Sequence, residues 1–418
     1  MKLQVSTDVI LFIVGAFAMA AIVSWLLTPV AIGVARRAGA IDQPDSARRV
    51  HRLPVARLGG LAVGITFALV GIVAVWIGHA NWPLDIARTL PGDPVIGKLV
   101  ALFIGVLLAM LLGFVDDRWQ IRARYQLLGQ LALAGIAIAG GILFVQIANP
   151  FQFLGAALGR PDLDLQELLA FHLTDDFVIP VVPIVLTALW IVGMINCINW
   201  IDGLDGLSTG VSLIAALTLG VISITAAPIE PLVALLCAVL AGSLAGFLPW
   251  NFHPARVFIG TAGVMVVGYV LAVLSIMGTA KVAVALLILG VPIIDTFWII
   301  IRRLASGASP FEADRGHLHH RLLDLGLTHR GAVLLIYAIA AALGVSGLLL
   351  SSSGAGPLYA FLGIVIGGGF ALYLLTRRTR DPLDPASYPD EPDEVTTSSH
   401  PTPDSTGSGT PGHGTRPA

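Results

Sequence analysis

The most specific chemical pattern in the chain is a run of amides and carboxylates that begins at Asn196. It reads Asn196-Cys-Ile-Asn199-Trp-Ile-Asp202-Gly-Leu-Asp205-Gly. These four polar residues recur every three positions, so a continuous helix would place them all on one face. Amide and carboxylate oxygens are ligands that a hard divalent cation such as Mg²⁺ accepts. The alternative is a capped helix joint, which explains four such side chains next to strongly apolar segments poorly.

A second acidic pattern, Asp116-Asp117, ends an apolar segment. Two adjacent carboxylates repel each other unless a cation lies between them or one of them takes a proton. A magnesium site and an ordinary acidic helix terminus explain this pair equally well.

Two further segments combine arginine with histidine, a composition that favours binding of phosphate or diphosphate. The first contains Arg48 and His51 and is followed by Gly59-Gly60, although by itself it favours a basic membrane anchor over a phosphate site. The second runs from Asp314 to Gly326, and its flanking arginines and tight histidine spacing disfavour a zinc site. Its candidate diphosphate-binding residues are His317, His319, His320 and Arg321.

Apolar segments must position these polar patterns, because the 418 residues are 56% hydrophobic and only 12% charged. A soluble domain has roughly 25% charged residues, so we predict an all-α, polytopic membrane protein with about eleven transmembrane helices. The predicted spans are about 8–35, 58–78, 98–115, 125–147, 177–195, 207–226, 231–249, 263–279, 281–301, 331–351 and 357–375. Asp295 falls inside one of them, which makes it a functional candidate whose role the sequence leaves open.

Arginine distribution predicts the orientation of the bundle, because basic residues in short loops stay on the cytoplasmic side. The side predicted to be outside keeps only Lys2, Arg88, Lys98, Arg160 and Lys281. We therefore expect an outside N-terminus, a cytoplasmic C-terminus and every polar pattern at the cytoplasmic face. The transmembrane domain should cover 1–380, and the Pro-, Ser- and Gly-rich segment 381–418 should be a disordered tail.

Together these patterns resemble the polyprenyl-phosphate N-acetylhexosamine-1-phosphate transferases, a bacterial family of integral membrane enzymes. The resemblance extends from about Asp42 to Gly326 and rests on Asp116-Asp117, on the run from Asn196 to Leu207, and on the histidine segment. The form Arg-Gly-His-Leu-His-His-Arg is similar to the branch that primes cell-wall or surface polysaccharides with GlcNAc-1-phosphate. It is less similar to the triple-histidine form of the peptidoglycan-precursor branch.

The resemblance implies transfer of a sugar-1-phosphate from a UDP-sugar to polyprenyl (undecaprenyl) phosphate at the plasma membrane, with release of UMP. It implies Mg²⁺ as the cofactor, for which Mn²⁺ could substitute; a homodimer is compatible with it, and no nucleic-acid partner is expected. Asp116, Asp117, Asp202 and Asp205 would then be catalytic, with the first three holding the metal. The substrate-binding residues would be Asn196, Asn199, Arg48, His51, His317, His319, His320 and Arg321.

One position departs from the family pattern. Where the family has Gly-Asp-x-Gly-Ser, with the aspartate a magnesium ligand, this chain reads Gly260-Thr261-Ala-Gly263-Val264. A neutral hydroxyl is a weak ligand compared with a carboxylate. Two hypotheses follow from this departure: an active enzyme with an altered site, or a catalytically silent family member. The many predicted spans and Asp295 leave a transporter as a third hypothesis. We favour the active enzyme because the other motifs are intact.

Overall fold

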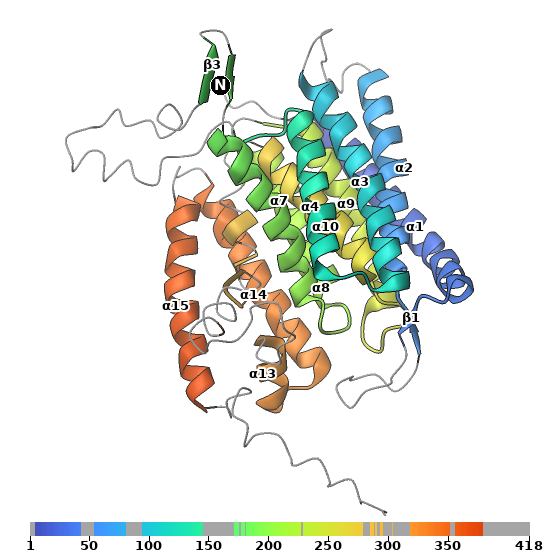
Figure 1. Cartoon of the computed structure of the whole chain (residues 1–418), viewed down its shortest axis with the longest axis vertical. Coiled ribbons are helices and arrows are strands. Elements are labelled where there is room, and N and C mark those ends of the chain that lie inside the picture. The colour runs from blue at the N-terminus through green and yellow to red at the C-terminus, as the bar shows by residue number, and fades with distance from the viewer. Residues whose placement is uncertain are drawn as a thin grey trace, which may run out of the picture.

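In a computed structural model, the described residues of the chain form mainly long helices (Figure 1). The structure describes residues 5–42, 54–80, 94–144, 171–174, 177–179, 181–226, 229–278, 285–287, 289–290, 293–295, 303, 318–351 and 356–378. The helices are α1 (Thr7–Ala38), α2 (Gly59–Ala80), α3 (Pro94–Trp119), α4 (Ala123–Ala139), α7 (Val181–Ile201), α8 (Leu207–Thr225), α9 (Pro231–Asn251), α10 (Gly260–Met277), α13 (Leu318–Asp324), α14 (His329–Leu350) and α15 (Gly356–Arg378). Two small antiparallel sheets pair β1 (Ile41–Asp42) with β2 (Val55–Ala56), and β3 (Phe171–Thr174) with β4 (Phe177–Ile179).

Eight of the described helices are long and apolar enough to cross a membrane, namely α1, α2, α3, α7, α8, α9, α10 and α14. Large apolar side chains such as Leu69, Leu107 and Leu189 are exposed on the outside of the bundle, as lipid-facing residues are. The prediction of a polytopic helical membrane protein is therefore confirmed. The number eleven and the orientation stay predictions, since α4 has 17 residues and most of 281–301 lies outside the described residues. The predicted tail, 381–418, also lies outside them.

Small residues bring α1 and α9 into close contact. A Cβ atom at Gly242 would lie 2.2 Å from the carbonyl oxygen of Phe17, and one at Gly246 would lie 2.0 Å from that of Ala21. Glycines four positions apart let two helix backbones approach closely, and such packing is a main source of helix association in lipid. The Gly242–Gly246 pair therefore fixes α1 against one side of α9.

We expect Gly246→Leu to lower the stability of the purified protein by about 1–3 kcal/mol, because the added side chain forces α1 away from α9. The thermal unfolding midpoint in detergent measures this effect. Gly193→Leu on α7 is the matched control, since a Cβ there has no atom within 4 Å. Equal midpoints for the two variants would contradict the assigned packing.

All the polar patterns that the structure describes lie at one end of the bundle, where α3, α7 and α9 finish and α4, α8, α10 and α14 begin (bottom of Figure 1). We call it the site end. The segment before α2 is tied there to the segment before α10, because Ala56 forms a parallel bridge with Val257. The amides of Gly59 and Gly60 then donate to the carbonyl oxygens of Phe258 and Ile259, at 3.0 and 2.7 Å. Helix starts far apart in the sequence are thus held side by side.

Candidate functional site

Asp117 lies at the end of α3 and caps the N-terminus of α10. Its Oδ1 accepts a hydrogen bond from the amide of Thr261 at 2.8 Å, and its Oδ2 accepts one from the amide of Ala262 at 3.0 Å. The first amides of a helix have no partner within the helix and carry partial positive charge, so a buried carboxylate is stabilised there. Gly260 has φ +67°, and a Cβ there would lie 2.7 Å from Asp117 Oδ2, so glycine is required for this close approach.

Asp116 contacts the residue at which the chain departs from the family pattern. Its Oδ2 accepts a hydrogen bond from the hydroxyl of Thr261 at 2.6 Å, while its Oδ1 accepts from Gln126 Nε2 at 2.7 Å and from the amide of Ile121 at 3.0 Å. The two adjacent carboxylates are therefore both stabilised by protein donors. A threonine at position 261 is compatible with the charge of Asp116 without a metal ion, whereas a second carboxylate at that distance would repel it.

The helix expected to align Asn196, Asn199, Asp202 and Asp205 ends at Ile201, so the expectation of one continuous face is wrong for the last two residues. Asp202 and Asp205 lie instead in the tight turn between α7 and α8, where Gly203 and Gly206 interrupt the helix. Gly206 has φ +80°, a conformation that favours glycine. A helical period cannot predict this turn.

Asp202 is partly buried in this turn and accepts a hydrogen bond from Ser208 Oγ at 2.6 Å. Burial raises the pKa of Asp202 to about 6, and the Ser208 hydrogen bond and the positive charge of Arg57 only partly oppose this rise. Arg57 also interacts electrostatically with Asp117. One guanidinium thus lies near both acidic patterns and links them electrostatically.

Asp205 is buried and belongs to a cluster with two histidines. Its Oδ2 lies 2.7 Å from His253 Nδ1 and accepts a hydrogen bond from the amide of Ala255 at 3.1 Å. Its own amide donates to His329 Nε2 at 3.0 Å, and the rings of His253 and His329 are stacked with centroids 4.1 Å apart. Arg330 donates from Nη2 to the carbonyl oxygen of His253 at 2.9 Å. Residues from the start of α14 and from the loop after α9 therefore hold Asp205 in place.

Asp205, His253 and His329 could also be taken for a metal site, since their ligand atoms all lie within 4.8 Å of one another. Two stacked rings, 20° from parallel, do not direct their in-plane lone pairs at one point. Imidazole ligands also suit Zn²⁺ better than Mg²⁺. We therefore interpret the cluster as a hydrogen-bonded support for Asp205. Asp116, Asp117 and Asp202 do not form such a set of three among the residues that the structure describes.

The chemistry of the acidic residues nevertheless fits Mg²⁺, because a carboxylate oxygen that accepts one hydrogen bond keeps a second lone pair. Asp116 Oδ2, both oxygens of Asp117 and Asp202 Oδ1 each accept one hydrogen bond. Mg²⁺ in phosphoryl-transfer sites takes one or two carboxylates together with substrate phosphates and water. A set of three convergent protein carboxylates is therefore not required.

Asn196 makes an amide pair that joins two helices. Its Nδ2 donates to Gln130 Oε1 on α4 at 2.7 Å and to the carbonyl oxygen of Val192 at 2.8 Å. This pairing directs the side chain of Asn196 towards α4, and the substrate-binding role predicted for it has no support from these contacts. The carbonyl oxygen of Asn199 accepts the amide of Asp202 at 3.3 Å, which places Asn199 directly at the turn.

The histidine segment is described only from α13 onward. Arg48, His51 and His317 lie outside the described residues, and for His319 and His320 only the helical backbone is described. Arg321 is buried in α13. Asp295, whose role the sequence leaves open, accepts a hydrogen bond from the amide of Leu318 at 2.8 Å and so caps the start of α13. Asp295 thus helps to position the helix that carries His319 and His320.

Sequence reasoning missed His253, His329, Ser208 and Gln126. A signal was present for two of them, because His253 directly follows α9 in Asn251-Phe-His253-Pro and His329 opens α14 in Thr-His329-Arg330. A histidine beside the end of an apolar segment is the same kind of signal as Asp116. Gln126 and Ser208 lie among ordinary helical residues, and only their contacts with the acids reveal them.

The pKa of Asp202 leads to a prediction about pH. If the ionised carboxylate is the active form, activity is present above about pH 6 and is lost as the pH falls through that value. Ser208→Ala removes a hydrogen bond that stabilises the ionised form, so the acidic limb of the rate profile should move to higher pH. Rates of UMP release between pH 5 and 8 test this, with Ser212→Ala, one turn further along α8, as the control. An unchanged limb in Ser208→Ala would exclude Asp202 as the group that titrates.

Comparison with known proteins identifies the family of the chain. Residues 99–279 match the family model described as glycosyl transferase family 4. The chain is 33% identical over 347 residues to a probable undecaprenyl-phosphate N-acetylglucosaminyl 1-phosphate transferase of Bacillus subtilis (strain 168), covering 82% of this chain and 86% of the relative. It is 30% identical over 343 residues to a decaprenyl-phosphate N-acetylglucosaminephosphotransferase of Mycolicibacterium smegmatis, covering 76% and 77%. An undecaprenyl-phosphate alpha-N-acetylglucosaminyl 1-phosphate transferase of Escherichia coli (strain K12) is 28% identical over 332 residues, covering 77% and 79%.

Proposed function

The chain belongs to glycosyl transferase family 4, and we propose that it transfers GlcNAc-1-phosphate from UDP-GlcNAc to a polyprenyl phosphate, releasing UMP. This is the reaction type that the names of the relatives state, and it would be the priming step of cell-wall or surface polysaccharide synthesis. The family predicted from the polar patterns is confirmed. The relatives do not favour the transporter hypothesis.

One observation carries the proposal for the site: acids from two separate segments of the chain lie at one end of the bundle. Asp116 and Asp117 contact the start of α10, while Asp202 and Asp205 lie in the turn before α8, and Arg57 interacts with both groups. A donor that is soluble and an acceptor confined to the headgroup layer must meet at such a surface. Confinement of the acceptor also orients it, which lowers the entropic cost of the reaction.

The reaction needs little covalent chemistry from the protein. An oxygen of the lipid phosphate attacks the phosphorus that bears the sugar, and the bond from that phosphorus to the bridging oxygen breaks. The bridging oxygen keeps the electron pair and leaves as part of UMP. Catalysis then depends on positioning the two phosphates and on cancelling their charge.

The residues of the chain divide these tasks. Mg²⁺, when bound, supplies the positive charge that the two phosphates require, and Asp116, Asp117 and Asp202 would hold it. We assign a catalytic role to Asp205 as well, whose buried carboxylate is held in a defined orientation by bonds to His253 and Ala255 and by the bond of its own amide to His329. We propose that the histidine segment binds the diphosphate, since α13 carries it to the same end of the bundle.

The site end should face the cytoplasm, where UDP-sugars are made. Exposed arginines gather there, and basic residues in short loops favour that side. Those of the described residues are Arg36, Arg37, Arg118, Arg122, Arg124, Arg256 and Arg330.

The proposal is tested by UMP release from UDP-GlcNAc, using membranes that contain the protein and added decaprenyl phosphate, with Mg²⁺ or with a chelator. We expect release that requires both Mg²⁺ and the lipid phosphate. A screen of other UDP-sugars under the same conditions identifies the donor. Absence of release from every UDP-sugar, with folded protein confirmed, would remove the proposal.

A further inference from the structure

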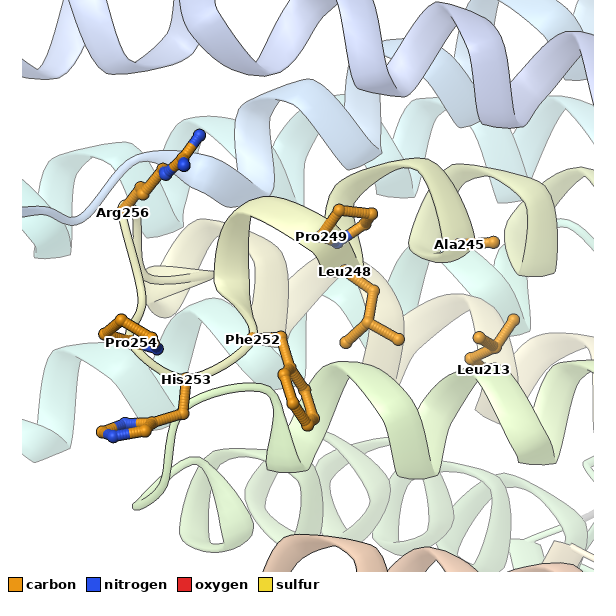
Figure 2. A pocket seen from close by; sticks show the side chains of 8 residues that line it. All are labelled: Leu213, Ala245, Leu248, Pro249, Phe252, His253, Pro254 and Arg256. Atoms are coloured by element: carbon orange, nitrogen blue, oxygen red, sulfur yellow. The ribbon is translucent and has the colours of Figure 1, made fainter. Parts of the chain in front are cut away.

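A pocket of about 550 Å³ opens at the site end between α8 and α9 (Figure 2). None of the four candidate catalytic aspartates lines it. Leu213 of α8 and Ala245 and Leu248 of α9 form its apolar part. His253 and Arg256, from the loop after α9, lie at its opposite end (Figure 2). The pocket is therefore apolar towards the membrane interior and basic at its mouth.

A second pocket of about 270 Å³ lies farther from the site end, along the same contact between α8 and α9. We call the two pockets together the seam. Leu217, Val221 and Ile224 of α8 line the second pocket, together with Phe17 of α1 and Ala238 of α9. Leu213 and Leu217 are one helical turn apart, so the two pockets follow each other along one face of α8. From Leu213 to Ile224 this face is about 16 Å long, close to half of the roughly 30 Å hydrocarbon core.

The mouth of the seam carries groups that bind phosphate at a membrane surface. Arg256 is exposed and lies over the ring of Trp250, with 5.5 Å from Cζ to the ring centroid, and Trp25 of α1 lies 6.2 Å from Trp250. Tryptophans mark the headgroup level of a bilayer. Within the described residues no carboxylate forms a salt bridge with Arg256. Arg330, bonded to the carbonyl oxygen of His253, adds a second guanidinium nearby.

We propose that this seam binds an anionic phospholipid, with its phosphate at Arg256 and one acyl chain along α8 and α9. The basic mouth favours a negatively charged headgroup over a zwitterionic one, and each basic side chain near an anionic lipid surface contributes about 1 kcal/mol. The apolar length matches an acyl chain of one leaflet, whereas a polyprenyl chain is longer than the seam. The loop from Phe252 to Arg256 also supplies two of the bonds to Asp205, so bound lipid would brace the loop that supports the site.

Native mass spectrometry of the full-length protein with added phosphatidylglycerol or phosphatidylcholine tests the proposal without using activity. We expect the wild type to retain phosphatidylglycerol preferentially. Arg256→Gln should bind it about fivefold more weakly, as loss of one basic contact predicts. Leu213→Trp, which fills the apolar part, should weaken it at least as much. Arg124→Gln is the matched control, because Arg124 is exposed at the same end and lies over Tyr125, away from the seam.

Unchanged thermal unfolding midpoints would establish that the variants are folded. Phosphatidylglycerol binding that is equal in the wild type, Arg256→Gln and Leu213→Trp would overturn the proposal. If the wild type retains phosphatidylcholine as well as it retains phosphatidylglycerol, the role of the basic mouth would be overturned. Displacement of phosphatidylglycerol by equimolar decaprenyl phosphate, dependent on Arg256, would identify the acceptor lipid as the occupant and overturn the assignment to a phospholipid. Since none of these measurements requires turnover, their failure is distinct from failure of the proposed transferase activity.

Discussion

Asp205→Asn is expected to lower the rate of UMP release by about 100- to 1,000-fold, the usual cost of removing one oriented polar group that stabilises charge in a transition state. Asparagine has nearly the same size, so the hydrogen bond from the backbone amide of residue 205 to His329 and the turn before α8 should persist. The substitution removes the negative charge and one of the two carboxylate oxygens. The initial rate at saturating UDP-GlcNAc and decaprenyl phosphate measures the effect.

Two variants separate this role from a general loss of structure. Arg124→Gln changes an exposed side chain that lies over Tyr125 at the start of α4, at the same end of the bundle, and should leave the rate unchanged. His329→Ala removes the imidazole that accepts the Asp205 amide, so it should reduce the rate less, about 10- to 100-fold, as loss of a supporting residue does. A rate for Asp205→Asn within about threefold of the wild type would exclude Asp205 from the catalytic site.

The sequence predicts the class of fold and the general place of the site because both depend on local patterns. Apolar length identifies membrane helices, and Asp116, Asp202 and Asp205 each stand at an abrupt change from apolar to polar sequence. The structure brings these residues to the same end of the bundle. The histidine segment stays a prediction for the most part, since His317 and the side chains of His319 and His320 lie outside the described residues.

Pairwise contacts between distant segments could not be predicted in the same way. Asn196 has the spacing of a site residue, yet its amide pairs with Gln130, which is 66 positions away. His253 and His329 contact Asp205 from 48 and 124 positions away in the sequence. A periodicity within one helix gives no information about contacts between residues so far apart. Gly203 and Gly206 could have indicated that the helix ends before Asp202, because glycine is unfavourable inside a helix.

The hydrogen bond between Thr261 and Asp116 explains how the chain tolerates a neutral residue where its family has an aspartate. The hydroxyl of Thr261 donates to Asp116 Oδ2 at 2.6 Å, and its amide donates to Asp117 at 2.8 Å. In the family pattern, a carboxylate at position 261 would face Asp116 directly. Two carboxylates at that distance are compatible only with a bound cation or a shared proton. With Thr261, Asp116 can therefore stay ionised without a bound metal ion. The amide of Thr261 still donates to Asp117, so the cap of α10 is kept.

Thr261→Asp should consequently make the stability of the protein depend on Mg²⁺. In the presence of a chelator we expect a loss of about 3 kcal/mol, the cost of an uncompensated charge in a buried site, and recovery when Mg²⁺ is added. The thermal unfolding midpoint in detergent, with and without Mg²⁺, measures this. Thr261→Asn, which is similar in size but neutral, should respond to Mg²⁺ no more than the wild type does.

The same variant discriminates between an active enzyme and a silent family member. If the natural protein is active, wild type and Thr261→Asp should both release UMP with Mg²⁺, and the variant should lose more activity when Mg²⁺ is lowered. If only Thr261→Asp turns over, Thr261 has silenced the natural protein, and the proposed activity would be withdrawn for it. A midpoint of Thr261→Asp that does not respond to Mg²⁺ would instead contradict the 2.6 Å contact on which this reasoning depends. Stability and turnover therefore test separately whether position 261 controls metal binding and whether that control decides catalysis.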